Sequence, residues 1–220
     1  ILANRVPAIG RIALAPMLSK RGKLIGDFTV TRLGEECIQL NASYGAQAFH
    51  LRWFLEHLPE SGVEVRNVSD ERIGFQIAGP KARELLCRVT RADVSNEAFP
   101  FLSVRQIEVG MVPAIVCRVS YTGGLGYEIY VDPRHQVSLY HTLSEAGADL
   151  GLKPFGMRAM MSLRLEKSFG SWMREYKPDY SAAETGLDRF VRFGKNDFIG
   201  REAAVAERDN PPPRRLVTFI

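Results

Sequence analysis

Cysteine is scarce in this chain, and its spacing fits neither a disulfide framework nor a zinc site. Cys37, Cys87 and Cys117 are the three cysteines among 220 residues, and no two form a CxxC pair. An odd and widely spaced set argues against a disulfide scaffold and favours a reducing compartment. Each one lies among apolar residues, so we expect three small buried side chains rather than a nucleophile.

The common signatures of hydrolases and metalloenzymes are also missing. The sequence contains no GxSxG or HExxH motif and no Cys-His arrangement. Its four histidines show no ligand spacing, and we interpret them as core or surface residues. We therefore expect no metal site. These histidines are His50, His57, His135 and His141.

Neither a long apolar run nor a block of like charges occurs. No stretch approaches the roughly 20 apolar residues that span a bilayer, and 29 Lys+Arg against 25 Asp+Glu are spread along the chain. We expect no membrane span and no nucleic-acid partner. The first ten residues, ILANRVPAIG, lack a charged leader with an apolar core, so we expect no secretory signal and interpret the chain as part of a longer protein.

The hydrophobic periodicity predicts an α+β fold with antiparallel sheets and flanking helices. Residues 22–43 alternate like a β-hairpin, and residues 45–62 form an apolar stripe that ends at Pro59 and Gly62. Residues 63–150 follow the order strand, strand, helix, strand, strand, helix. A helix entered through Gly200 and a final strand after the prolines at 211–213 are expected near the end.

Two carboxylates stand inside strand-like runs. Asp27 follows a glycine in LIGDFTV and fits either a turn or solvent-facing charge, or a partly buried general base. Glu128 lies in GYEIYV, opposite the apolar face formed by Tyr127, Ile129 and Val131. Periodicity alone places Glu128 on the wet side of an edge strand, and TGGLG before it predicts a flexible hairpin turn rather than a phosphate loop.

Four stretches in matching order resemble one known family. They are RGKLIGDFTVTRL with CIQLNAS, IGFQIAGPKARELL, CRVSYTGGLGYEIYV, and the long run from SLRLEKSFG to KNDFIGREA. The chain resembles the folate-binding aminomethyltransferase family, which includes the T-protein of the glycine cleavage system. It is most similar to the related C-terminal half of dimethylglycine and sarcosine dehydrogenases, through LEK, MREYKPDYSAAETGL and KNDFIG.

The resemblance implies a T-protein-like folate-binding fold, truncated at both ends. Residues 1–62 and 151–210 are expected to form one discontinuous subdomain. Residues 63–150 are expected to form an inserted ferredoxin-like α+β subdomain, and residues 211–220 a linker and the start of a C-terminal β-barrel.

The resemblance also assigns site residues. Asp27 matches the carboxylate beside the reactive nitrogens of tetrahydrofolate, where it stabilises developing positive charge. Glu128 matches the residue that accepts hydrogen bonds from the pterin edge. Tyr121 and Asn41 match residues near the folate.

Several positions depart from the family pattern or leave a choice open. Gly26 replaces the first of two consecutive aspartates, and Met160 stands where T-proteins have an arginine. Arg158 is close enough in sequence to substitute for that arginine, and Arg164 is matched in SLRLEK, with a structural role favoured. Trp172 and Glu175 either line the cavity or serve packing and surface roles.

The resemblance implies a tetrahydrofolate-dependent transfer of a methylene unit, with a donor derived from dimethylglycine, sarcosine or glycine. Alternatives are a stand-alone aminomethyltransferase or tetrahydrofolate-dependent demethylase, and a non-catalytic folate-binding or regulatory module. The implied cofactor is tetrahydrofolate, with FAD in an upstream domain as a further option. Implied partners are a lipoyl carrier protein or a flavin domain, and the implied location is the bacterial cytoplasm or the mitochondrial matrix.

Overall fold

The computed structural model describes residues 1–219, which form two compact units. The expected boundaries lay after residues 62 and 150, whereas the chain crosses between units after Asn67 and Phe169. Residues 151–169 therefore belong to the second unit. The first unit comprises residues 1–9, 13–67 and the described residues from 170 onward, and the second comprises residues 10–12 and 68–169.

A three-stranded sheet organises the first unit. Its order is β1 (Ile12–Leu18), β2 (Leu24–Arg32) and β3 (Ile38–Asn41). β2 and β3 pair antiparallel, with Thr29 opposite Asn41, which confirms the predicted hairpin. Leu33 and Gly34 both donate backbone hydrogen bonds to the carbonyl of Cys37, and these bonds close the turn between the strands.

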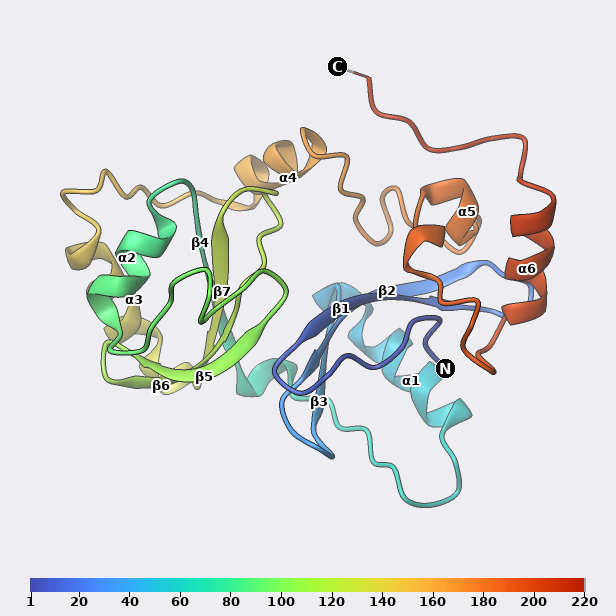
Figure 1. Ribbon diagram of the computed structural model, residues 1–220, viewed down its shortest axis with the longest axis horizontal. Coiled ribbons are helices and arrows are strands. Elements are labelled where there is room, and N and C mark those ends of the chain that lie inside the picture. The colour runs from blue at the N-terminus through green and yellow to red at the C-terminus, as the bar shows by residue number, and fades with distance from the viewer. Residues whose placement is uncertain (220) are drawn as a thin grey trace. The chain divides into compact units, whose positions relative to one another are not determined.

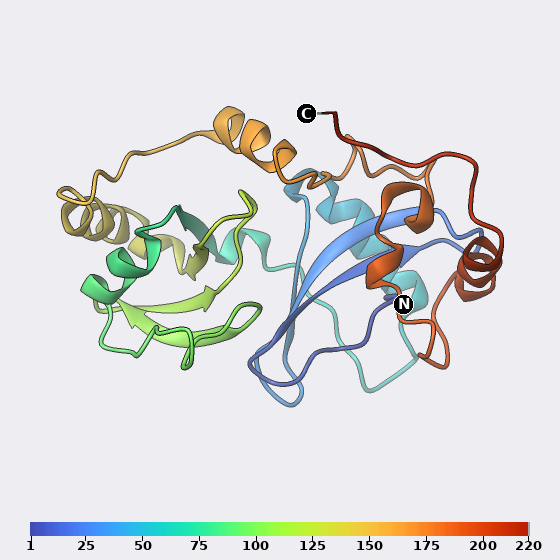
Figure 2. The ribbon, with the colours of Figure 1, turned by 45° about the horizontal axis from the view of Figure 1, so that its top comes forward.

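Helix α1 (Gln47–His57) packs against one face of this sheet, as Figure 2 shows. Phe54 of α1 and Phe28 of β2 meet edge to face, with 5.5 Å between ring centroids. Both rings and Val30 are buried in one core cluster. The predicted helix is therefore confirmed, but of its apolar stripe only Phe54 is buried and Leu55 is exposed, and Phe54 covers the face of β2 that carries Phe28 and Val30.

The last part of the chain builds a second core in the first unit. The short helix α5 (Ala182–Thr185) and the helix α6 (Arg201–Asp209) contribute Ala182 and Ala204 to it. α6 begins after Gly200, whose φ of 83° is left-handed and favours glycine, as expected. Residues 214–219 form no strand, so the predicted final strand is wrong for the described residues.

A buried carboxylate ties the segment after α6 to this core. Glu184 accepts hydrogen bonds from Lys23 Nζ at 3.0 Å and Arg214 Nε at 2.6 Å. It also forms a capping box with Ser181 at the start of α5. Burial disfavours the ionised form, but hydrogen bonds from Arg214, Ser181 and Lys23 together lower the pKa of Glu184 to about 2.

Replacing Glu184 with glutamine is expected to lower the free energy of unfolding at pH 7 by about 1–2 kcal/mol. A lowered pKa stabilises the folded state above the ordinary value of 4.5, and this contribution is lost as the pH falls toward about 2. Urea unfolding at pH 7, 4 and 3 should therefore show the two proteins converging at low pH. Glu56→Gln, which removes an exposed pair with Arg52, should change stability by less than about 0.5 kcal/mol. A larger loss for Glu56→Gln than for Glu184→Gln would contradict this account.

The second unit contains a four-stranded antiparallel sheet in the order β4-β7-β6-β5. β5, β6 and β7 follow one another along the chain and pair as neighbours, while β4 lies at the edge. Residues 63–68 form no strand, so one predicted strand is missing. The strands are β4 (Ile73–Ala78), β5 (Val104–Val109), β6 (Val112–Cys117) and β7 (Gly126–Val131).

Two helices cover one face of this sheet (Figure 1). α2 (Ala82–Val89) and α3 (Gln136–Ala146) bury Leu86 and Leu139 in a core shared with β7. A third helix, α4 (Met157–Leu165), completes the unit. The element order is strand, helix, three strands, helix, which differs from the strand-helix-strand-strand-helix-strand order of the ferredoxin-like unit that we expected. The difference is that the last strand, β7, precedes α3 instead of following it.

The burial of the cysteines, the lengths of the helices and the short 3-10 turns complete the description. Of the three cysteines, Cys117 is buried, while Cys37 and Cys87 are exposed, so the expectation of three buried thiols is wrong. Cys37 precedes the edge strand β3, and Cys87 lies on α2 away from its buried positions. None of the helices in residues 1–219 is long and apolar enough to cross a membrane. The 3-10 turns are Tyr44–Ala46, Ser69–Glu71, Pro133–His135 and Asp188–Phe190.

Candidate functional site

Glu128 lies at the centre of the second unit's sheet. It stands on β7 directly opposite Gln76 of β4 on one side and Cys117 of β6 on the other. Tyr127 and Ile129 are fully buried on the helix-covered face, so alternation places Glu128 on the other face. The predicted face is confirmed, but Glu128 is half-buried in the interior of the sheet and not on an edge strand.

A tyrosine orients this carboxylate. The hydroxyl of Tyr130 donates a hydrogen bond to Glu128 Oε2 at 2.6 Å. Its ring lies across Gly74, where an added Cβ would stand 3.2 Å from the ring. A larger residue at position 74 would displace the ring, so Gly74 makes this arrangement possible. The alternation on β7 placed Tyr130 beside Glu128, but the hydrogen bond was not foreseen.

Burial shifts the pKa values of both Glu128 and Tyr130. Burial raises the pKa of Glu128, and the hydrogen bond from Tyr130 opposes this rise. Burial, together with the charge of Glu128, raises the pKa of Tyr130 well above its ordinary value. Tyr130 is thus the donor of this pair, and the other oxygen of Glu128 is left as an acceptor.

The glycine-rich turn before β7 carries Tyr121. Its ring stacks on Phe169, with centroids 6.4 Å apart and an interplanar angle of 19°. Gly123 has a left-handed φ of 73°, and the side chain of Lys167 covers its Cα. The turn is thus packed against residues that follow α4 rather than left free in solvent.

Two arginines of α4 differ in their surroundings. Arg164 is 2% exposed and donates from Nη1 to the carbonyl of Phe169 at 2.7 Å. It therefore supports the loop on which Tyr121 stacks. Arg158 is exposed on the first turn of α4.

Asp27 and Asn41 lie on one face of the first unit's sheet. Asp27 and Thr29 share a face of β2 by alternation, and Asn41 is directly opposite Thr29. Asn41 is held by the amide of Gln39, which donates to its Oδ1 at 3.0 Å. Burial raises the pKa of Asp27 to about 6, although a hydrogen bond with its own backbone acts against the rise. The half-buried general-base interpretation of Asp27 thus has a physical basis.

His50 and Phe28 fill the space beside Gly26. A Cβ at position 26 would lie 2.8 Å from His50 Nε2 and 2.7 Å from the Phe28 ring. His50 Nε2 lies 3.0 Å from the carbonyl of Ile25, so it carries the proton and donates. Burial lowers the pKa of His50, which favours the neutral ring. The sequence predicted a core or surface histidine, and the structure places His50 in the core, beside Gly26.

Trp172 and Glu175 belong to the same unit as Asp27. Trp172 is buried, and its ring centroid is 5.3 Å from that of His50. Glu175 accepts a hydrogen bond from the backbone of Ser171 at 2.9 Å. Both residues therefore make contacts that shape the loop after Gly170.

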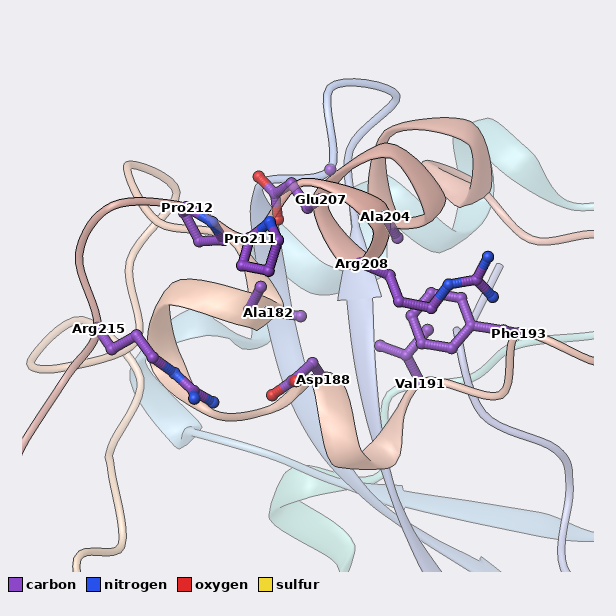
Figure 3. Close-up of a pocket in the computed structure, with 12 residues that line it drawn as sticks. Ala182, Asp188, Val191, Phe193, Ala204, Glu207, Arg208, Pro211, Pro212 and Arg215 are labelled. Carbon is purple, nitrogen blue, oxygen red and sulfur yellow. The ribbon is translucent and has the colours of Figure 1, made fainter.

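Cavities occur in each unit, and none of the predicted site residues lines the two described next. A cleft of about 910 Å³ in the second unit is bordered by β4, the start of α2, and residues 150–157. A cavity of about 160 Å³ in the first unit lies beside α6 (Figure 3). In Figure 3, Pro211 and Pro212 lie over it near Glu207, and Arg208 lies along the ring of Phe193. It is a gap beneath the segment that Glu184 anchors, and none of the six predicted site residues lines either cavity.

The described residues contain no group of three His, Cys, Asp or Glu side chains that could hold a metal ion. The predicted residues fall into two sets. Asp27 and Asn41 belong to the first unit, and Tyr121, Glu128, Arg158 and Arg164 to the second.

Comparison with known proteins gives the context of this arrangement. The chain is 36% identical over 220 residues to mitochondrial dimethylglycine dehydrogenase of Homo sapiens, covering 99% of the chain and 25% of that protein. It is 34% identical over 203 residues to an aminomethyltransferase of Caldanaerobacter subterraneus subsp. tengcongensis, covering 92% of the chain and 54% of that protein. The chain thus spans about a quarter to a half of the relatives that it matches.

The fold is also similar to that of a solved aminomethyltransferase. The crystal structure of glycine cleavage system aminomethyltransferase T from Bartonella henselae matches with a TM-score of 0.79 at 22% identity, over 96% of this chain and 57% of that chain. This confirms the expected T-protein-like fold with antiparallel sheets and flanking helices. The model of the GCVT N-terminal domain matches residues 1–195. The chain therefore belongs to the GCVT N-terminal domain family.

Proposed function

We propose that this domain binds a reduced folate and assists the transfer of a one-carbon unit to it. The observation that carries the proposal is the Glu128–Tyr130 pair, a half-buried carboxylate whose second oxygen remains available as an acceptor. Burial raises the pKa of Glu128, so ionising it inside the sheet costs stability, and such a residue is expected where a ligand needs a carboxylate. Homology to aminomethyltransferases supports the reaction class.

The side chains fit a pterin. The pterin edge presents a ring N–H beside an amino group, and one carboxylate can accept both hydrogen bonds, because Tyr130 uses only one of its about four lone-pair sites. Tyr130 fixes the rotamer of Glu128, and Gln76 and Cys117 flank it on the same sheet face. Tyr121, supported by Phe169, adds an aromatic surface. These contacts would discriminate against analogues that lack the two donors, because Glu128 would then be left unpaired.

Asp27 is assigned the electrostatic role. When bound, tetrahydrofolate would supply the amine nitrogen that accepts the one-carbon unit. An anionic Asp27 would stabilise positive charge at that nitrogen and accept or relay a proton, since its pKa of about 6 lies near the working pH. Asn41 shares its sheet face and is assigned the orientation of the same substrate.

The two arginines of α4 take different parts in this proposal. Arg158 supplies an exposed positive charge for an anionic part of the folate. Arg164 supports Tyr121 through Phe169 and so acts at one remove from the ligand.

For the one-carbon donor, we propose a methylene-amine derived from dimethylglycine or sarcosine. The match to human dimethylglycine dehydrogenase over 99% of the chain favours this donor. A stand-alone aminomethyltransferase is the second candidate, favoured by the 34% identity to the Caldanaerobacter protein. A flavin domain elsewhere in the longer protein, and its FAD, belong to the first candidate alone. We infer the mitochondrial matrix as the compartment for the first candidate and the bacterial cytoplasm for the second.

A calorimetric titration of the intact protein with tetrahydrofolate tests the proposal. We expect saturable binding with a dissociation constant in the micromolar range, about 8 kcal/mol of binding free energy. The product 5,10-methylenetetrahydrofolate should then form when the donor is supplied, and mass spectrometry detects it. Binding without product would reduce the domain to a folate-binding or regulatory module, and absence of binding would refute the proposal.

A further inference from the structure

Two arginines of the second unit converge on one neutral oxygen. Nη2 of Arg83 and Nη2 of Arg118 each donate to Oδ1 of Asn96 at 2.6 Å. The two nitrogens can therefore lie no more than 5.2 Å apart. Guanidinium groups repel each other at this separation, so the amide oxygen of Asn96 is a weak partner for two full charges.

Both guanidinium groups are fixed by the core beneath them. Arg83 Nε donates to the hydroxyl of Tyr127 at 3.2 Å, and Arg118 Nη1 donates to the carbonyl of Phe99 at 2.5 Å. Phe99 and Tyr127 are fully buried, with ring centroids 5.6 Å apart. The two charges are therefore held together by the scaffold rather than by chance placement of flexible chains.

No acidic side chain neutralises them. In the part of the chain that the structure describes, no carboxylate lies within 4.0 Å of either guanidinium. Arg88, also on α2, shows the contrast, since it pairs with Glu84 and Asp149. The Nε of Arg118 is buried and has no acceptor within residues 1–219. Among the described residues, the pair thus carries positive charge that no carboxylate neutralises and a donor that no acceptor satisfies.

We propose that Arg83 and Arg118 form a binding site for a small oxyanion, a phosphate monoester or a carboxylate. Asn96 occupies the place of an anionic oxygen and is exposed on the loop between α2 and β5, so its side chain can turn aside. The forked donors of two guanidiniums match the oxygens of either anion. Arg83 contacts Tyr127 on the helix-covered side of β7, opposite Glu128. The site is therefore distinct from the proposed pterin site and does not depend on it.

The test titrates the intact protein separately with inorganic phosphate and with glutarate, at constant ionic strength set by chloride. Binding is followed by the shift of the unfolding temperature and by calorimetry. We expect saturation by one of these probes at millimolar concentration, and the active probe identifies the anion class. Arg83→Gln and Arg118→Gln should each weaken that binding at least tenfold. Arg134→Gln removes the same charge from an exposed pair with Asp132 and should leave it unchanged.

Substitutions of Asn96 distinguish an anion-binding role of the two arginines from a purely structural role. Asn96→Asp supplies a permanent carboxylate, so the unfolding temperature should rise and the probe should no longer bind. Asn96→Ala should preserve or strengthen binding, because it vacates the place of the anion. These surface changes keep the test decisive even where an arginine variant fails to fold. Saturation by neither probe, equal loss in Arg134→Gln, or unchanged affinity in Asn96→Asp would each overturn the proposal.

Discussion

Replacing Glu128 with alanine is expected to weaken tetrahydrofolate binding to the intact protein about 100-fold, or about 2.7 kcal/mol. Two charge-assisted hydrogen bonds are lost, each worth about 1.5 kcal/mol, the weak end of the range for charged groups, because the site is only half-buried. Glu128→Gln should lose nearly as much, because an amide places a donor against the donors of the pterin. Calorimetric titration of each variant measures the change.

Glu128→Gln should weaken binding but increase stability. A carboxyl whose folded-state pKa is raised stabilises the fold below its ordinary value of 4.5, and this contribution is lost as the pH rises through the higher folded value. Raising the pH to 7 therefore destabilises wild type relative to a variant that has no carboxyl group to ionise. Glu128→Gln keeps the shape without the charge and should unfold at a higher temperature than wild type at pH 7. The difference should shrink as the pH falls below 4.5.

A matched control stands in the same sheet. Glu108 is exposed on β5, and Glu108→Ala removes one carboxylate from the sheet at an exposed position. It should change neither folate affinity nor the pH dependence of stability. Equal affinity of wild type and Glu128→Ala would remove Glu128 from the folate site, and a similar loss in Glu108→Ala would show a general effect of charge.

Local patterns in the sequence predicted the elements that carry the site. Alternation in GYEIYV gave the face of Glu128, and the hairpin pattern placed Asp27 and Asn41 on neighbouring strands. These features depend on residues close together in sequence, where the period of a strand is reliable. The resemblance to a family then assigned roles that periodicity could not supply.

Features that depend on distant residues escaped prediction. The Tyr130–Glu128 bond requires Gly74, which reaches β7 only when β4 pairs with it. His50 fills the space beside Gly26 only once α1 has packed on β2. Both are contacts across elements, which a single sequence without an alignment does not reveal.

The strand predicted at 63–68 failed for a related reason. VEVRNV alternates, yet none of its residues is buried in the structure, and no neighbouring strand pairs with it. β-propensity reflects packing against neighbours more than an intrinsic preference of the backbone. An alternating hexapeptide without a partner therefore remains a loop.

Asp27→Asn is expected to lower the folate-dependent rate of one-carbon transfer about 100- to 1,000-fold. Asparagine is nearly isosteric, so the contacts of β2 are preserved and the lost property is the charge. It cannot stabilise a developing cation at the folate nitrogen, nor accept a proton from it. Single-turnover rates with saturating donor and tetrahydrofolate measure the loss apart from binding.

The pH dependence of kcat/KM and of stability tests the role of Asp27 independently. Asp27 is active as the anion, so kcat/KM of wild type should rise with pH and level off above its pKa of about 6. That limb should disappear in Asp27→Asn. Because burial raises the folded-state value from 3.8, the contribution of Asp27 to stability falls as the pH rises from about 3.8 to about 6. Asp27→Asn should therefore be more stable than wild type at pH 7, by up to about 3 kcal/mol.

Stability and activity should thus change in opposite directions at Asp27, which a structural role could not produce. Asp197→Asn, at an exposed position of the same unit, should change neither the rate nor its pH profile. Asp27→Glu tests position, since it keeps the charge but moves it by one methylene, and should retain part of the rate. A folate-dependent rate unchanged in Asp27→Asn would remove this residue from the mechanism. A lower rate accompanied by lower stability would instead mean that Asp27 holds the sheet together, and that its charge is structural.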